Sequence, residues 1–397
     1  MKFSGKIEAC GLSPIRKFAP YAAEAEKNGR RIYHLNIGQP DIETPAVYFE
    51  AVNHFSQKVL AYAPSAGMPE LIHAIQNYYA GIGAQLNEDQ ILISNGGSEA
   101  LQMVLSAILD DGDEIIVPEP FYPNYSTFIS LTGADVCPVT TRPEEGYRFA
   151  DRERIEACIH ENTRAILLTN PGNPTGTVLT KDELKLLADI AKEHELFLIG
   201  DEVYREFVYG GEPLMSLLQL ESYDDNVVVI DSVSKRFSAC GARIGCAISR
   251  NRELYNHMMK WCQGRLCAST IDQIGAAALY SVERKYFQTV REEYKARRDA
   301  LIDGMKKIPG VVFSEPKGAF YMMAALPVED AEEFQIWMLR EFEDRGETLM
   351  FTPAESFYRT PGIGRNEIRM AYVINRRDIA RSMELLAKGL EVYRNRA

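Results

Sequence analysis

The sequence predicts an α/β protein with one large, mostly parallel sheet between layers of helices and a smaller α+β domain beside it. Between residues 45 and 275, short apolar runs that suit β-strands alternate with helical patterns. The C-terminal third has a different pattern, with a long helical run followed by shorter elements and Pro-Gly breaks at 309 and 361. Alternating strands and helices are typical of a parallel sheet, because each connecting helix crosses one of its faces.

These changes of pattern predict how the chain is divided. We expect residues 1–44 to form an N-terminal arm and part of the small domain, and residues 45–275 to form the large domain. Residues 276–397 then supply a long connecting helix and the C-terminal small domain. The connecting helix belongs to a helical run that extends over residues 271–310.

Six apolar runs predict the buried strands of the large domain. Each is short and continuous, as expected for strands that are covered on both faces. They are ILIS (91–94), EIIVP (114–118), AILLT (165–169), LFLIG (196–200), NVVVID (226–231) and GCAIS (245–249).

The clearest helix between these strands lies at residues 179–195, LTKDELKLLADIAKEHE. Thr180 and Glu183 have the spacing of a capping box, in which each side chain bonds the other residue's backbone amide. Apolar residues then recur on one helical face, at Leu184, Leu187, Ala188 and Ala191.

Composition excludes several classes of partner. Lys and Arg number 44 against 56 Asp and Glu, a net charge of −12 without any basic run, so we expect neither a nucleic-acid nor an anionic-membrane partner. No segment approaches the ~20 apolar residues of a membrane span and the N-terminus lacks a signal-like apolar core, so we expect a cytoplasmic protein.

The seven cysteines are scattered along the chain, which fits reduced thiols better than a disulfide framework. Cys240, Cys246, Cys262 and Cys267 lack the short paired spacings of a zinc site. We therefore expect no metal.

Polar residues follow five of the predicted strands, at the point where each strand ends. In parallel sheets ligands bind beyond the carboxyl ends of the strands. Each motif alone fits an ordinary turn or solvated loop, but their shared edge indicates a ligand site. They are NGGSEA (95–100), PEPFYPNY (118–125), NPGNPTG (170–176), DEVY (201–204) and DSVSK (231–235).

One group of these residues suits a phosphate. Gly97 and Ser98 open a predicted helix and offer free amide hydrogens, a hydroxyl and the positive end of the helix. Arg243 can add a bidentate clamp and Ser232 a further hydroxyl.

A second group suits an aromatic, nitrogen-containing ring. Tyr122 offers a face for stacking, Asp201 a carboxylate for a ring nitrogen, and Asn173 and Tyr204 hydrogen bonds for a ring oxygen. Lys235 stands among small residues, where it can form an imine, although a lysine on a surface loop is the alternative. A phosphorylated ring beside such a lysine describes pyridoxal phosphate held as a Schiff base.

The motifs, in their order along the chain, resemble those of fold-type-I pyridoxal-phosphate-dependent aminotransferases of class I/II, the aspartate-aminotransferase-like family. The resemblance covers nearly the whole chain and differs only in details, such as Gly97-Ser98 for the family's frequent Ala-Thr and Tyr122 for the Trp of its acidic-substrate branch. The motifs that carry it are NIGQPDIETP, AYAPSAGMPELIHAI, GGSEA, PFYPNY, NPGNPTG, DEVY, SVSKRFSACGARIG, GAFYMMAAL and EIRMAYV.

The resemblance implies roles for individual residues. Lys235 is the catalytic residue, and the cofactor-binding residues named above are joined by Tyr62, which reaches the phosphate of the neighbouring subunit. Gly38 lies against the substrate, and Arg369 with Asn173 holds its α-carboxylate. The implied activity is transamination between an L-amino acid and a 2-oxo acid, in a homodimer with shared active sites.

Substrate choice rests on a shorter match. Arg265, with Ser269 four residues later, resembles a pair that the aspartate-aminotransferase branch contributes from the partner subunit to hold a side-chain carboxylate and the phosphate. An ion-pairing role at the surface or an interface is the alternative for Arg265, and Arg16 is a second candidate for the carboxylate. We predict aspartate or another acidic donor with 2-oxoglutarate.

Two other functions use the same fold and cofactor. A pyridoxal-phosphate-dependent carbon–sulfur β-lyase expels a side-chain group instead of exchanging the amino group, and the motifs do not separate it from a transaminase. A pyridoxal-phosphate-sensing regulator needs a DNA-binding module as well, and we do not expect one in this acidic chain.

Overall fold

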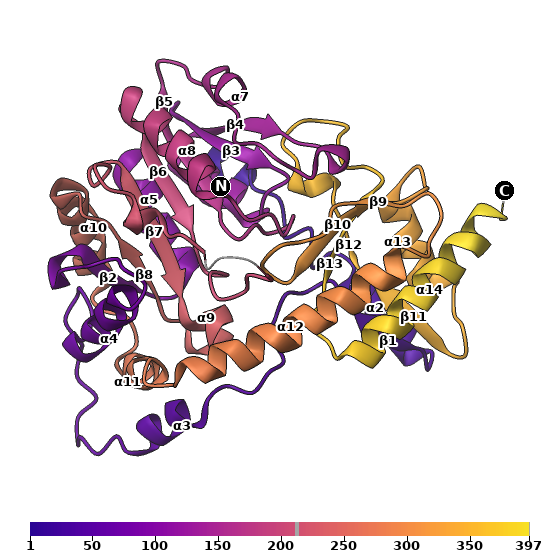
Figure 1. Cartoon of the computed structure of the whole chain (residues 1–397), viewed down its shortest axis with the longest axis horizontal. Helices are drawn as coiled ribbons and strands as arrows, with labels where there is room; N and C mark the ends of the chain where they lie inside the picture. The colour runs from indigo at the N-terminus through magenta and orange to yellow at the C-terminus, as the bar shows by residue number, and fades with distance from the viewer. Residues whose placement is uncertain (211–213, 397) are drawn as a thin grey trace.

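A seven-stranded sheet forms the centre of the larger part of the molecule (Figure 1). The structure is a computed structural model that describes residues 1–210 and 214–396. In spatial order the strands are β2 (Ile91–Ser94), β8 (Gly245–Ile248), β7 (Val227–Ser232), β6 (Phe197–Asp201), β5 (Thr163–Thr169), β3 (Glu114–Glu119) and β4 (Asp135–Thr140). Only β8 runs against its neighbours β2 and β7, so the predicted mostly parallel sheet is confirmed.

The sheet contains all six predicted strands and one that the sequence analysis missed. Strand β4 was missed because Pro138 interrupts its apolar pattern and Asp135 at its start is exposed. Both features are tolerated because β4 is the last strand of the sheet, where it pairs only with β3.

Helices cover both faces of this sheet, because alternate strand residues point to opposite sides. Leu92 and Ile115 pack with α5 (Gly97–Ile108), α6 (Asn124–Thr132) and α10 (Arg252–Arg265). Ile93 and Ile116 pack on the other side with α4 (Pro69–Ala80), α7 (Arg152–Glu156), α8 (Lys181–Glu193) and α11 (Thr270–Leu279). Helix α8 begins with the predicted capping box of Thr180 and Glu183.

Two smaller sheets combine the N-terminal arm with the C-terminal third. A four-stranded antiparallel sheet has the order β12 (Thr352–Pro353), β13 (Glu367–Ala371), β10 (Tyr321–Ala325) and β9 (Val312–Phe313). Strand β1 (Arg31–His34) pairs in parallel with β11 (Glu347–Met350), so the arm lies beside residues more than 300 positions away. The domain boundaries at residues 45 and 275 stay predictions.

The remaining helices frame these sheets. Helix α12 runs from the neighbourhood of α9 and α11 toward α14 and β1, along the lower side of the view in Figure 1. These remaining helices are α1 (Gly5–Glu8), α2 (Ala19–Lys27), α3 (Ala46–Asn53), α9 (Val233–Arg236), α12 (Arg284–Met305), α13 (Ala331–Arg340) and α14 (Arg376–Arg394). No helix among residues 1–210 and 214–396 combines the length and apolar character needed to cross a membrane.

The helical run predicted over residues 271–310 is divided in two. Helix α11 ends at Leu279 and α12 begins at Arg284, with Glu283 extended at the cap. In the break, the Tyr280 ring packs edge-on against Tyr78 and Phe237, which ties this turn to α4 and to the end of α9. The sequence pattern missed the break because both helices keep an apolar face.

A buried ion pair fixes the short helix α9, which carries Lys235. Arg236 Nη2 donates to Asp231 Oδ2 over 2.6 Å, and both side chains are fully buried. Asp231 also accepts a hydrogen bond from Tyr79 Oη at 2.9 Å, and the Arg236 guanidinium lies 4.1 Å from the centre of the Tyr78 ring. The pair therefore joins the end of β7 to α9 and to α4.

We expect Arg236→Met to destabilise the cofactor-free protein by about 3–5 kcal/mol, because it leaves the Asp231 carboxylate buried without its cation. The double variant Asp231→Leu/Arg236→Met removes both charges and should recover much of this loss. Denaturant unfolding measures both free energies.

Arg252→Met is the matched control, since it breaks an ion pair with Asp89 in which both side chains are exposed. We expect it to cost less than about 1 kcal/mol. Equal losses in Arg236→Met and Arg252→Met would show that the buried pair has no special structural role.

Candidate cofactor and substrate site

A cavity of about 550 Å³ lies beyond the carboxyl ends of the parallel strands. Its wall brings together eleven of the residues predicted from the sequence, although they come from segments spread over more than 300 positions. They are Gly38, Gly97, Ser98, Tyr122, Asn173, Asp201, Tyr204, Ser232, Lys235, Arg243 and Arg369. Arg16, the second candidate for a substrate carboxylate, also lines the cavity.

One end of the cavity offers donors for a phosphate. Helix α5 begins at Gly97, and Gly96 before it has φ +80°, a conformation that favours glycine. A Cβ at Gly96 would overlap the guanidinium of Arg243, whose Nη1 donates to Cys240 O at 3.0 Å. The helix N-terminus, Ser98 and Arg243 therefore meet at one point, which fits an anion with several oxygens.

A carboxylate lies deeper in the same cavity. Asp201 ends β6, accepts a hydrogen bond from Tyr125 Oη at 2.6 Å, and is 3.3 Å from the backbone amide of Val203. Burial raises the pKa of Asp201 to about 6, although both hydrogen bonds and the charge of Lys235 act in the opposite direction. A carboxylate in this position can pair with a protonated ring nitrogen and regain a charge partner.

The aromatic and amide side chains predicted for the ring lie around this carboxylate. Tyr122 packs edge-on against Tyr125 with ring centres 5.7 Å apart, and its hydroxyl accepts from Asn124 Nδ2 at 2.8 Å. Asn173 Nδ2 is 3.4 Å from Tyr204 Oη, so both can reach one ring oxygen. Together with the phosphate donors, these residues fit pyridoxal phosphate.

Lys235 points from α9 into the cavity. Its Nζ donates to Gly38 O at 2.9 Å and lies 3.8 Å from Cys240 Sγ. The chain approaches closely at Gly38, where a Cβ would overlap the hydroxyl of Tyr321. A primary amine that is held in this way inside the cavity can attach to a carbonyl group and can transfer a proton.

Arg369 offers a buried cation for a substrate carboxylate. It lies on β13 with only 2% of its surface exposed, and it donates to Asn173 Oδ1 at 3.2 Å and Asn36 O at 2.7 Å. Burial lowers its pKa, and its Nε has no hydrogen-bond partner within the described part of the chain. A buried guanidinium with a free donor and no carboxylate partner is suited to an incoming anion.

Four further residues complete the site, and the sequence analysis did not single them out. The hydroxyls of Tyr321 and Tyr204 share a hydrogen bond of 3.0 Å. The centre of the Tyr321 ring lies 4.6 Å from Cζ of the Arg369 guanidinium. Tyr125 holds Asp201, and its position three residues after Tyr122, at the start of α6, was a usable signal. Asn36 and Cys240 had no comparable sequence signal.

Two predicted residues do not line the cavity. Tyr62 is 79% exposed on the surface of the chain. The Arg265 side chain is only 12% exposed, donates from Nη2 to Ile93 O at 3.0 Å, and has its Nη1 3.5 Å from Glu99 Oε2. These contacts give the ion-pairing alternative for Arg265 a structural basis, and the substrate-binding roles of Tyr62 and Arg265 stay predictions.

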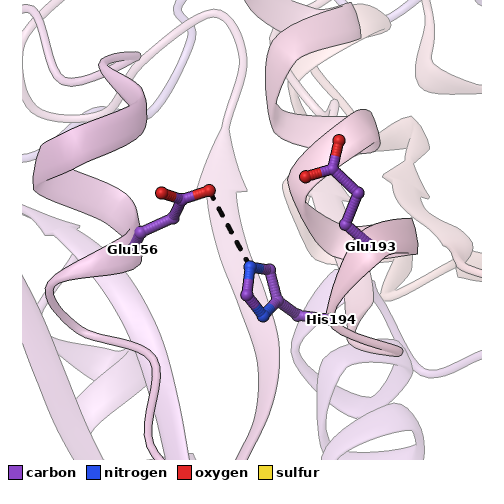
Figure 2. Close-up of side chains that lie close together, drawn as sticks. All are labelled: Glu156, Glu193 and His194. Carbon is purple, nitrogen blue, oxygen red and sulfur yellow. Dashed lines mark ion pairs between the residues drawn. The ribbon is translucent and has the colours of Figure 1, made fainter.

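A second group of ionisable residues lies away from the cavity, at the surface between α7 and α8 (Figure 2). It consists of Glu156, Glu193 and His194, whose ligand atoms all lie within 4.8 Å of one another. Arg152 Nη1 donates to Glu156 at 2.7 Å and to Glu193 at 2.6 Å. Ion pairing with Arg152 therefore accounts for the close approach of the two carboxylates.

The chain resembles known aminotransferases over nearly its whole length. The model of the family "Aminotransferase class I and II" matches residues 30–365. Aspartate aminotransferase of Pyrococcus horikoshii is 29% identical over 96% of this chain and 95% of its own. A probable N-acetyl-LL-diaminopimelate aminotransferase of Bacillus subtilis is 33% identical over 97% of this chain and 93% of its own. The structure of Thermus thermophilus aspartate aminotransferase with maleate has a TM-score of 0.88 at 28% identity, and the similarity covers 98% of this chain and 100% of that one.

We expect the free energy of unfolding of the cofactor-free protein to decrease as the pH rises, because Asp201 loses its proton. Its pKa is about 6 in the folded chain against 3.8 as the ordinary value, so the folded state binds this proton more tightly. The stabilisation is therefore complete below about pH 4 and lost by about pH 6, and it amounts to about 3 kcal/mol at about 1.4 kcal/mol per pKa unit.

Asp201→Asn removes this proton without removing the side chain. Its free energy of unfolding, relative to that of the natural chain, should rise between pH 4 and pH 7 by up to about 3 kcal/mol. A difference between the two proteins that does not change with pH would place the titration elsewhere.

We also expect Gly96→Ala to weaken the binding of pyridoxal phosphate at least about tenfold, which corresponds to about 1.4 kcal/mol. The added methyl overlaps the Arg243 guanidinium and displaces it. Gly112→Ala is the matched control, because Gly112 has φ +89° but a Cβ there would meet only open space. Equal affinity of the two variants, titrated by cofactor absorbance, would contradict a phosphate site between Gly96 and Arg243.

Proposed function

Because the chain belongs to the class I and II aminotransferase family, we propose that it transfers the amino group of an acidic L-amino acid to a 2-oxo acid. Family membership makes it a pyridoxal-phosphate-dependent aminotransferase, and an amino acid and a 2-oxo acid are its substrates. The proposed donor is aspartate or another acidic amino acid, and the proposed partner is 2-oxoglutarate.

The residues of the cavity suit distinct tasks in this reaction. When bound, pyridoxal phosphate supplies a carbonyl for attachment and a ring that withdraws negative charge from the substrate's α-carbon. We assign to Lys235 Nζ the attachment and the movement of the α-carbon proton, because this amine points into the cavity. Asp201 holds the proton of the ring nitrogen, and Arg369 with Asn173 orients the α-carboxylate.

The charge balance of the cavity carries the proposal of an acidic donor. Four cationic side chains line it, Arg16, Lys235, Arg243 and Arg369, against one carboxylate, Asp201. Arg243 faces the cofactor phosphate and Arg369 the α-carboxylate, which leaves Arg16 as a cation without an assigned anion and favours a substrate with a second carboxylate. Several relatives are named aspartate aminotransferase, which supports the same choice.

We further propose that the enzyme acts as a homodimer. Residues 59–62 expose Val59, Leu60 and Tyr62, with exposed fractions of 71%, 61% and 79%. Large apolar side chains gathered on one surface segment are typical of an interface. Tyr62 would then extend from this segment to the phosphate end of the partner's cavity.

Half-reactions with single amino acids, followed by cofactor absorbance without any acceptor, test the proposed activity. We expect aspartate or glutamate alone to convert the cofactor to its pyridoxamine form. Lys235→Ala should still bind the cofactor but give no such conversion at a comparable rate, because the proton carrier is missing.

Other outcomes would contradict parts of the proposal. Conversion by aromatic or aliphatic donors only would retain the aminotransferase and refute the acidic donor. Release of pyruvate from cysteine-type substrates, with the pyridoxal spectrum restored, would identify the carbon–sulfur lyase. Retained turnover in Lys235→Ala would remove Lys235 from its proposed role.

A further inference from the structure

Among the arginines that line the cavity in the described chain, Arg16 alone has no task in the proposed reaction. Arg243 lies beside Gly96 at the phosphate end of the cavity, where the cofactor phosphate would be the counterpart of its charge. Arg369 is buried beside Asn173, where it meets the α-carboxylate. Arg16 therefore supplies a positive charge in the substrate cavity for which neither the phosphate nor the α-carboxylate is the counterpart.

The N-terminal arm holds the backbone of Arg16 at the cavity from both sides. Before it, Lys6 Nζ donates to Thr132 O at 3.0 Å, which ties the arm to the end of α6. After it, Phe18 is buried in a cluster with Leu339 of α13. These two anchors place the intervening segment against the cavity, where Ser13, Ile15 and Arg16 form part of the wall.

The side chain of Arg16, by contrast, is exposed and unpaired. Over the described residues it takes part in no ion pair or side-chain hydrogen bond, whereas the adjacent Lys17 pairs with Glu332. An arginine that is held by its backbone and has all five N–H donors available can accept a carboxylate in bidentate geometry.

The alternative cation, Arg265, is less available. Its guanidinium already donates to Ile93 O and lies near Glu99, and only 12% of the side chain is exposed. To meet a substrate carboxylate, Arg265 would have to leave both partners, and the Glu99 carboxylate would lose its cation. Arg16 gives up no such contact.

We propose that Arg16 recognises the side-chain carboxylate of dicarboxylic amino acids and 2-oxo acids, an inference that rests on the proposed function. The α-carboxylate binds Arg369 on β13, and the distal carboxylate binds Arg16 on the N-terminal arm. Monocarboxylic substrates leave Arg16 in solvent, so this residue determines specificity without taking part in the chemistry.

Binding of two non-reacting acids to the cofactor-loaded enzyme tests the proposal. Maleate carries two carboxylates and butyrate one, on chains of the same length, and cofactor absorbance reports both titrations. We expect Arg16→Gln to weaken maleate binding by roughly 10–100-fold, the loss of one charge-assisted hydrogen-bonded pair, and to leave butyrate within about twofold. Arg16→Lys should recover part of the maleate affinity, since it restores the charge but not the bidentate geometry.

Lys17→Gln is the matched control, because it removes one positive charge from the same segment without altering the cavity wall. We expect it to leave maleate binding within about twofold, which separates a direct contact from general electrostatics. In turnover assays, Arg16→Gln should lower kcat/KM for glutamate more than for alanine. Lys17→Gln should not show this difference between the two substrates.

Four results would overturn the inference. Unchanged maleate affinity in Arg16→Gln would show that the distal carboxylate binds elsewhere, and a selective loss in Arg265→Gln instead would assign it to Arg265. Equal losses for maleate and butyrate in Arg16→Gln would show a structural role for the arm. If the natural enzyme neither binds maleate more tightly than butyrate nor reacts with aspartate or glutamate, the acidic donor itself is refuted, which is a distinguishable failure.

Discussion

The placement of Lys235 depends on the buried ion pair of Asp231 and Arg236. Helix α9 contains only four residues, too few to be stable as an isolated helix. Asp231 is the second-last residue of β7, and its oxygens accept hydrogen bonds from Arg236, Tyr79 and the backbone amide of Ser232. The pair thus anchors α9 to the central sheet, which holds the amine of Lys235 beside Gly38 O.

The same pair influences the charge state of the neighbouring strand end. Asp201 of β6 is paired in register with Ile230 of β7, so Asp231 lies one residue beyond it. The charge of Asp231 raises the pKa of Asp201, but less than burial does. The charge of Asp231 thus acts against the ionised form of Asp201, and a cationic ring nitrogen beside Asp201 would favour that form. The carboxylate of the buried ion pair and the carboxylate proposed for the ring nitrogen therefore lie on adjacent strands, β7 and β6.

Parallel topology explains why so much of the site could be predicted from the sequence. The ends of β3, β5, β6 and β7 must meet at one edge, so the order of the motifs was enough to place Tyr122, Asn173, Asp201 and Lys235 together. Contacts that depend on tertiary packing were not predictable in this way. Tyr321 reaches the cavity from a separate sheet, and Cys240 does so through the loop after α9. The partners of Arg265 are likewise a strand carbonyl and a helix residue more than 150 positions away.

The position of the N-terminal arm is also determined by tertiary contacts and not by its local sequence pattern. The sequence made Arg16 only a second candidate for the substrate carboxylate, because its position at the cavity is produced by contacts with Thr132 on one side and α13 on the other. Those anchors lie on helices that pack against different sheets, α6 on the seven-stranded sheet and α13 beside the pair of β1 and β11. Arg369 on β13 and Arg16 on the arm are thus held by independent parts of the fold. The distance between these two guanidinium groups, and with it the length of dicarboxylate that can bridge them, is therefore set by how the two sheets pack and not by either motif alone.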